Sequence, residues 1–237
     1  MNGITMVHKI RASIASITSL AICAIVFTAC KNQETQFYQK SGFQPLASVN
    51  GSPTFFDETY VKAFVEFQGK SLELTRQRIE NDYQNGSLTK DMYDEKMAAY
   101  QLAKSENTRS FVIDGIIKNT LLEEEASKRD FDLPIEQYLA DAKAYTQTLK
   151  KSLDADSNAD KDESLVLYEA FLDDLGMTYD EYASSYLAYL YYIKDIKQEL
   201  KAALIKERGL QAKSEEEQNE AYEMYMEQLY QNAQVTF

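Results

Sequence analysis

Turn-forming residues are scarce in this chain, and their scarcity constrains the fold more than any other feature. The 237 residues include only three prolines and eight glycines. These two residue types mark most turns and loops, so a chain with few of them has few turns and long uninterrupted elements. The sequence therefore predicts a mainly α-helical fold that is built from long helices.

Capping residues and apolar spacing place the expected helices. Side chains that can accept hydrogen bonds from the first free amides of a helix stand before runs of apolar residues at helical spacing. They are Asp57, Thr89, Thr178 and Ser214. Ser214 is followed by Glu217 at the spacing of a capping box. We expect a helix to begin after each of these four residues.

Glycines mark where the expected helices end. We expect ends at Gly86, Gly176 and Gly209, because a glycine just past a helix lets the backbone turn and cap the last carbonyl groups. Gly69 leaves two alternatives open. It interrupts the first helix, or a second helix starts at Ser71.

Two short segments predict a small ribbon. Residues 47–49 alternate before the turn signal Asn50-Gly51, and residues 234–237 alternate at the end of the sequence. We expect a two-stranded ribbon that joins these N-terminal and C-terminal segments. The fold class is thus mainly α with a short ribbon.

The N-terminal segment has the organisation of a secretory signal peptide. His8, Lys9 and Arg11 supply positive charge, residues 12–27 form an apolar run of 16 residues, and no acidic residue precedes Cys30. Such a run is shorter than the ~20 residues that span a bilayer as a helix. The sequence therefore predicts export. The alternative is an uncleaved N-terminal anchor helix, which leaves the chain in the same compartment.

The segment ends on Thr-Ala-Cys and resembles a bacterial lipoprotein signal. In such signals the cysteine becomes the mature N-terminus and is acylated, with palmitate among its acyl chains. The resemblance implies a signal peptide over residues 1–29 and lipidation of Cys30. It also implies a lipid-anchored protein on the extracytoplasmic face of the cell membrane. We expect residues 30–45, which are polar beyond the cysteine, to tether this anchor to one helical domain, residues 46–237.

Cleavage before Cys30 would remove the groups that many enzymes use. His8 is the only histidine, and Cys23 is the only other cysteine. Without an imidazole or a free thiol, the mature chain is excluded from Ser-His-Asp and Cys-His catalysis, from Cys/His zinc sites and from disulfide formation. The net charge moves from −13 to −15 when the basic residues Lys9 and Arg11 are lost, and this acidic balance argues against nucleic acid. We expect no cofactor and no metal.

Several segments resemble SurA/PrsA-type peptidyl-prolyl isomerase chaperones. Ala-Ser-Val-Asn-Gly at 47–51 is similar to the strand and turn that open their N-terminal domain. Residues 111–131 resemble the long helix of that family, residues 171–190 a later helix start, and residues 222–237 the closing helix and strand. The resemblance implies a helical peptide-binding domain of the trigger factor/SurA type.

The parvulin isomerase domain of that family is missing from this sequence. In the family it is inserted between the long helix and the closing helix, at about residues 207–210 here, and its site carries histidines. The resemblance therefore implies the chaperone part without isomerase activity.

A stripe of tyrosines supplies the candidate peptide-binding residues. They are Tyr182, Tyr186, Tyr189 and Tyr192, of which the first three recur at helical spacing. Aromatic rings that carry a hydroxyl group offer a large contact area at low entropic cost, which suits loose recognition of unfolded chains. The alternative is core packing against residues 111–122.

An acidic segment, residues 154–163, places oxygen atoms at alternate positions, as a calcium-binding loop does. Ala159 stands where the sharp turn needs glycine, and Leu165 replaces the bidentate glutamate. We expect a solvated acidic loop, with weak extracellular calcium binding as the alternative. Paired carboxylates such as Asp173 and Asp174 are expected on exposed helix faces rather than in acid–base catalysis.

Together these patterns predict a membrane-anchored chaperone that works without ATP and without chemistry. Its expected partners are unfolded or exported polypeptides, whose apolar segments it would bind weakly and reversibly. No enzymatic activity is expected. The alternative is an adaptor or scaffold lipoprotein that binds one specific protein partner through the same surface.

Overall fold

The computed structural model describes residues 37–155 and 163–237. The chain divides into two compact units, residues 1–38 and 39–237, and every helix and strand of the described residues lies in the second unit. The signal peptide, Cys30 and most of the acidic segment that resembles a calcium loop lie outside the described residues. The predictions made for them therefore stay predictions.

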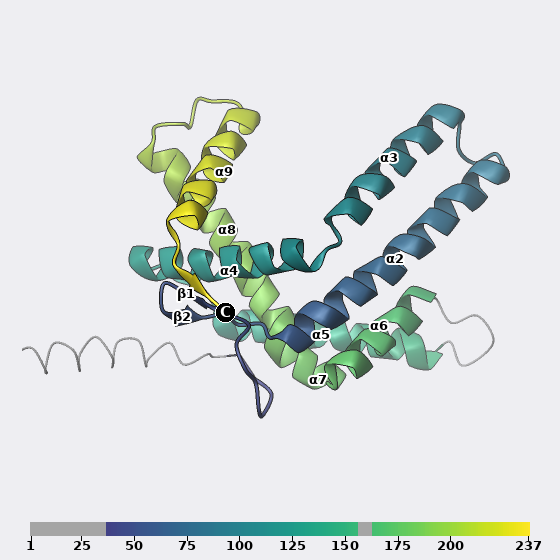
Figure 1. Ribbon diagram of the computed structural model, residues 1–237, viewed down its shortest axis with the longest axis horizontal. Coiled ribbons are helices and arrows are strands. Elements are labelled where there is room, and N and C mark those ends of the chain that lie inside the picture. The colour runs from purple at the N-terminus through teal and green to yellow at the C-terminus, as the bar shows by residue number, and fades with distance from the viewer. Residues whose placement is uncertain (1–36, 156–162) are drawn as a thin grey trace, which may run out of the picture. The chain divides into compact units, whose positions relative to one another are not determined.

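The second unit is mainly α-helical, as the scarcity of turn residues predicts (Figure 1). Its helices and strands follow one another as β1 (Ser48–Val49), β2 (Ser52–Pro53), α2 (Glu58–Gln84), α3 (Lys90–Glu106), α4 (Arg109–Arg129), α5 (Ile135–Ala155), α6 (Glu163–Leu175), α7 (Tyr179–Tyr182), the π-helical turn η1 (Ala183–Leu187), α8 (Ala188–Glu207), α9 (Glu215–Asn232) and β3 (Val235–Thr236).

The predicted helix starts are confirmed by their caps. The carboxylate of Asp57 accepts from the amide of Tyr60 at 2.8 Å, and the hydroxyl of Thr89 accepts from the amide of Met92 at 3.3 Å. Thr178 and Ser214 both form complete capping boxes with a glutamate three residues later. Each cap satisfies an amide that the first turn of a helix otherwise leaves without a partner.

Both alternatives for Gly69 are wrong, because α2 continues through this residue without interruption. The amide nitrogen of the Asn107 side chain, just after α3, donates to the carbonyl of Val65 at 3.1 Å. A Cβ atom on Gly69 would lie 3.3 Å from that nitrogen. The glycine therefore gives room for a side chain from another helix to reach the backbone of α2.

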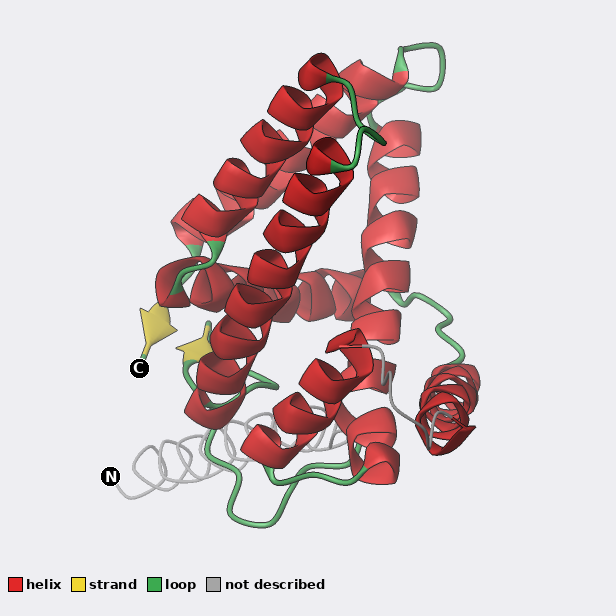
Figure 2. Cartoon of the chain, turned by 90° about the vertical axis from the view of Figure 1, so that its right-hand side faces the viewer, coloured by secondary structure: helices red, strands yellow, loops and turns green. Residues whose placement is uncertain are grey.

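The predicted ribbon is confirmed and has one more strand than expected. β1 pairs antiparallel with β3, with Val49 opposite Val235, and also antiparallel with β2. Asn50 and Gly51 both have positive φ, 51° and 91°, which is the backbone of the tight turn that links β1 to β2. The strands, yellow in Figure 2, lie beside the C-terminus.

The expected tether extends less far than predicted. The Nζ of Lys40 donates to the carbonyl oxygens of Leu175, at 3.3 Å, and Gly176, at 2.9 Å, both at the C-terminal end of α6. A cation at this end of a helix also complements its dipole. Residue 40 thus already belongs to the folded unit.

The core combines aromatic and aliphatic packing. Its aromatic part is formed by Phe55, Phe56, Tyr60, Phe171, Tyr182, Tyr186 and Tyr189, all of which are buried. The rings of Phe55 and Tyr189 stack with 4.0 Å between their centroids. α4 and α8 pack on each other, and each contributes buried aliphatic residues, among them Ile116, Leu121, Ile196 and Leu200.

Candidate peptide-binding surfaces

The tyrosine stripe lies in the core rather than on a binding surface. Tyr182, Tyr186 and Tyr189 are 6%, 4% and 1% exposed, so a peptide cannot reach them, and the peptide-binding role is not retained for these three. The residues after β2 cover them, because the ring of Phe56 stacks on Tyr186 with 5.3 Å between centroids. Tyr192 is half-buried.

The turn that contains Tyr186 and links Tyr182 to Tyr189 is a π-helix. In η1 the amide of Ala188 bonds to the carbonyl of Ala183, five residues earlier. Such turns are wider than an α-helical turn and occur mostly as single insertions in longer helices. Here the wide turn lies between Tyr182 and Tyr189, both of which are buried in the aromatic core. Sequence periodicity alone does not predict it.

Glu123, on α4, places its carboxyl group against this aromatic core. The hydroxyl of Tyr189 donates to Oε2 of Glu123 at 3.0 Å. Burial raises the pKa of Glu123 to about 7, and the negative charge of Glu124 acts in the same direction, while the hydrogen bond from Tyr189 opposes the rise. Glu123 therefore joins α4 to α8 through a hydrogen bond that favours the charged carboxylate, while burial makes that charge costly.

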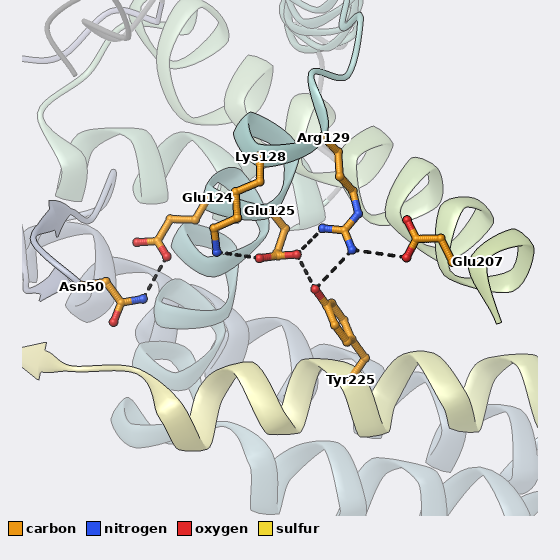
Figure 3. Close-up of polar contacts among 7 residues, drawn as sticks. All are labelled: Asn50, Glu124, Glu125, Lys128, Arg129, Glu207 and Tyr225. Atoms are coloured by element: carbon orange, nitrogen blue, oxygen red, sulfur yellow. Dashed lines mark hydrogen bonds and ion pairs between the residues drawn. The ribbon is translucent and has the colours of Figure 1, made fainter. Parts of the chain in front are cut away.

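A second carboxylate fastens α9 to α4. The side chain of Glu125 is only 4% exposed, and it accepts from Lys128, at 2.7 Å, and from Arg129 and Tyr225 (Figure 3). Burial acts to raise the pKa of Glu125, but these hydrogen bonds outweigh it and hold the pKa below its usual value. Arg129 also approaches Glu207 at the end of α8, with 3.6 Å between Nη2 and Oε2. This cluster ties three helices together.

The α2–α3 hairpin offers the first candidate surface. α3 packs mainly on α2, and Figure 1 shows the two helices extending together as an antiparallel pair. A helix that packs mainly on one neighbour leaves some of its apolar side chains partly exposed. Leu102 of α3 is 61% exposed, and Phe111, at the start of α4, is 53% exposed.

A groove of about 290 Å³ lies at the base of this hairpin, and we call it the hairpin groove. Its lining is formed by Phe67, Gln68, Ser71, Leu72, Ala103, Glu106 and Phe111. Most of its surface is apolar, and it has one carboxylate and no basic group. Such a groove can accept apolar side chains of a peptide without selecting for charge.

A second groove, of about 350 Å³, lies between α4, α8 and α9, and we call it the lysine groove. Its apolar lining is contributed by Leu122, Leu190, Ile193 and Met226. Lys118, Lys194 and Lys197 lie around these residues. The sequence patterns do not predict this groove, because the helices that form its three walls are far apart in the chain.

Comparison of the chain with family models, curated proteins and solved structures gave no match. The resemblance to SurA/PrsA-type chaperones therefore rests on the sequence segments alone. In residues 37–155 and 163–237, no helix is long and apolar enough to cross a membrane. The same residues contain no group of three or more histidine, cysteine, aspartate or glutamate side chains placed to hold a metal ion.

Proposed function

We propose that this protein is a membrane-anchored, extracytoplasmic chaperone that binds apolar segments of exported polypeptides without ATP and without isomerase activity. The hairpin groove is the observation that supports the proposal most. It has a largely apolar lining that includes Phe111, a residue that is 53% exposed, at the base of a two-helix projection. Exposed apolar surface of this kind favours weak binding of many sequences rather than tight binding of one.

The charge of the chain supports the same function. A net charge of −13 keeps the protein, and a complex with an unfolded client, away from neutrality, and so opposes aggregation. Lipidation of Cys30 would place the hairpin beside the membrane where exported chains emerge. Mass spectrometry of the mature N-terminus tests the anchor separately, because processing before Cys30 leaves an acylated cysteine as the first residue.

The test of chaperoning measures light scattering from chemically unfolded clients, with the full-length chain held in zwitterionic nanodiscs. We expect the protein to slow the aggregation of several unrelated clients. The double variant Leu102→Gln/Phe111→Gln should lose most of this effect without a large change in thermal stability, because both side chains are more than half exposed. Met224→Gln is the matched control, since Met224 is 56% exposed on α9 and lies outside both grooves.

Failure to slow the aggregation of any client would refute the proposal, and so would full activity of the double variant. The adaptor function remains the second candidate because the lysine groove has a more selective character than the hairpin groove. One saturable protein partner, together with no effect on general clients, would favour the adaptor.

A further inference from the structure

Gly115, inside α4, lines the lysine groove, and the packing around it does not require a glycine. Gly115 lies within α4 (Arg109–Arg129), where glycine destabilises a helix relative to alanine. A Cβ atom on Gly115 would meet no atom within 4 Å, and its φ is not positive. Neither close packing nor an unusual backbone therefore accounts for this glycine. Its absent side chain leaves room in the groove for a group from another molecule.

The charge of the lysine groove contrasts with that of the whole chain. Three lysines line it, beside one carboxylate, that of Glu223, although the chain carries a net charge of −13. Among the described residues, no carboxylate oxygen lies within 4.0 Å of the ammonium groups of Lys118, Lys194 or Lys197. Their charge is therefore available to a ligand.

Two of these ammonium groups are positioned by aromatic rings instead of by acids. The Nζ of Lys118 lies 5.7 Å from the ring centroid of Tyr230, and the Nζ of Lys197 lies 5.5 Å from that of Tyr222. A cation–π contact orders a lysine without neutralising its charge. The groove thus combines an apolar lining with a partly ordered cationic rim.

We propose that the lysine groove binds an acidic, amphipathic helical segment of a partner protein. Lining residues of α4 and of α8 recur at helical spacing, so each helix presents one continuous stripe to the groove. Apolar side chains of the partner helix lie over the exposed Gly115 and on the half-buried Leu190, and its glutamates or aspartates pair with the lysines. The acidic surface elsewhere repels such a segment and so directs it to this groove.

The probe is a fluorescein-labelled synthetic helical peptide with leucines on one face and glutamates on the other. Its charge-inverted twin has lysines in place of the glutamates. Fluorescence anisotropy is measured with the full-length chain in zwitterionic nanodiscs, at low and high salt. We expect the acidic peptide to bind, binding to weaken with salt, and the basic twin to bind at least about tenfold more weakly.

Lys194→Gln/Lys197→Gln should weaken binding of the acidic peptide by about five- to tenfold, as expected for the loss of two partly exposed ion pairs. Lys143→Gln/Lys150→Gln, on the exposed surface of α5, changes the net charge equally and should leave the affinity unchanged. Gly115→Leu separates binding from folding. It should raise the melting temperature, because leucine is a better helix former, and it should lower the affinity, because its side chain enters the groove.

Equal binding of the two peptides overturns the proposal, as does an unchanged affinity in the Lys194/Lys197 double variant. A Gly115→Leu protein that is more stable and binds equally well overturns it too. So does a preference for laurate over the acidic peptide, because the occupant would then be an anionic amphiphile rather than a protein helix. None of these results depends on the hairpin groove.

Discussion

Glu123 gives the sharpest prediction about stability. The substitution Glu123→Gln keeps the size of the side chain and an oxygen that can accept from the Tyr189 hydroxyl, which lies 3.0 Å from Oε2. It removes only the proton that the carboxyl group can lose. Because burial raises the pKa of Glu123 to about 7, the variant should differ from the wild type in a pH-dependent way.

The direction of the pH dependence follows from the number of protons that the folded and unfolded states bind. Between its ordinary pKa of 4.5 and the folded-state pKa of about 7, Glu123 holds its proton in the folded state and has lost it in the unfolded state. The wild-type protein therefore loses free energy of unfolding as the pH rises through this window. At ~1.4 kcal/mol per pH unit, the full loss is about 3 kcal/mol. Glutamine has no proton to lose, so Glu123→Gln should escape this loss.

Urea unfolding of the full-length chain at pH 5, 6, 7 and 8 measures the difference. We expect the two proteins to be similar near pH 5 and Glu123→Gln to be the more stable by about 3 kcal/mol at pH 8. Glu95→Gln, at an exposed position on α3, is the control and should show no such trend. A stability difference that stays constant from pH 5 to pH 8 would show that this burial argument is wrong.

Three further changes test single contacts. Glu125→Ala should lower the free energy of unfolding by about 3–5 kcal/mol at neutral pH, because it leaves Arg129 without its buried partner. This loss should shrink as the pH falls through the lowered pKa of Glu125, and a loss independent of pH contradicts that. Thr54→Val should lower the free energy of unfolding by about 1–3 kcal/mol, since the buried Thr54 hydroxyl accepts from the amide of Ala47 and donates to the carbonyl of Phe56. An unchanged midpoint of urea unfolding would contradict a stabilising role for these hydrogen bonds. Ser214→Ala should lower the free energy of unfolding by about 1 kcal/mol and speed hydrogen exchange in the first turn of α9, because the Ser214 hydroxyl no longer caps this helix. Unchanged exchange would show that the cap does not stabilise this turn.

Local features of the fold could be predicted from the sequence, because the residues that determine them are close together in the chain. The cap of α9 needs only Ser214 and Glu217, and the turn between β1 and β2 needs only Asn50 and Gly51. The path of α2 through Gly69 could not be predicted in this way. Its reason is Asn107, which arrives from the end of α3.

The binding surfaces were harder to predict for a related reason. Periodicity identifies side chains that share a helix face, but it does not identify what covers that face. The tyrosine stripe is covered by Phe55 and Phe56, which lie more than a hundred residues earlier in the chain. One signal of the lysine groove was present in the sequence. Gly115 lies inside a helix whose apolar residues recur at helical spacing, and a helix-interior glycine often has a packing or functional reason.

The central claim is that the hairpin groove binds unfolded polypeptide. Hydrogen exchange of the full-length chain, measured by mass spectrometry with and without an excess of an unfolded client, tests it most directly. We predict slower exchange in residues 64–72 and 100–112, which surround the hairpin groove, and unchanged exchange in α9. No change in the hairpin, or slower exchange confined to α8 and α9, would contradict the claim.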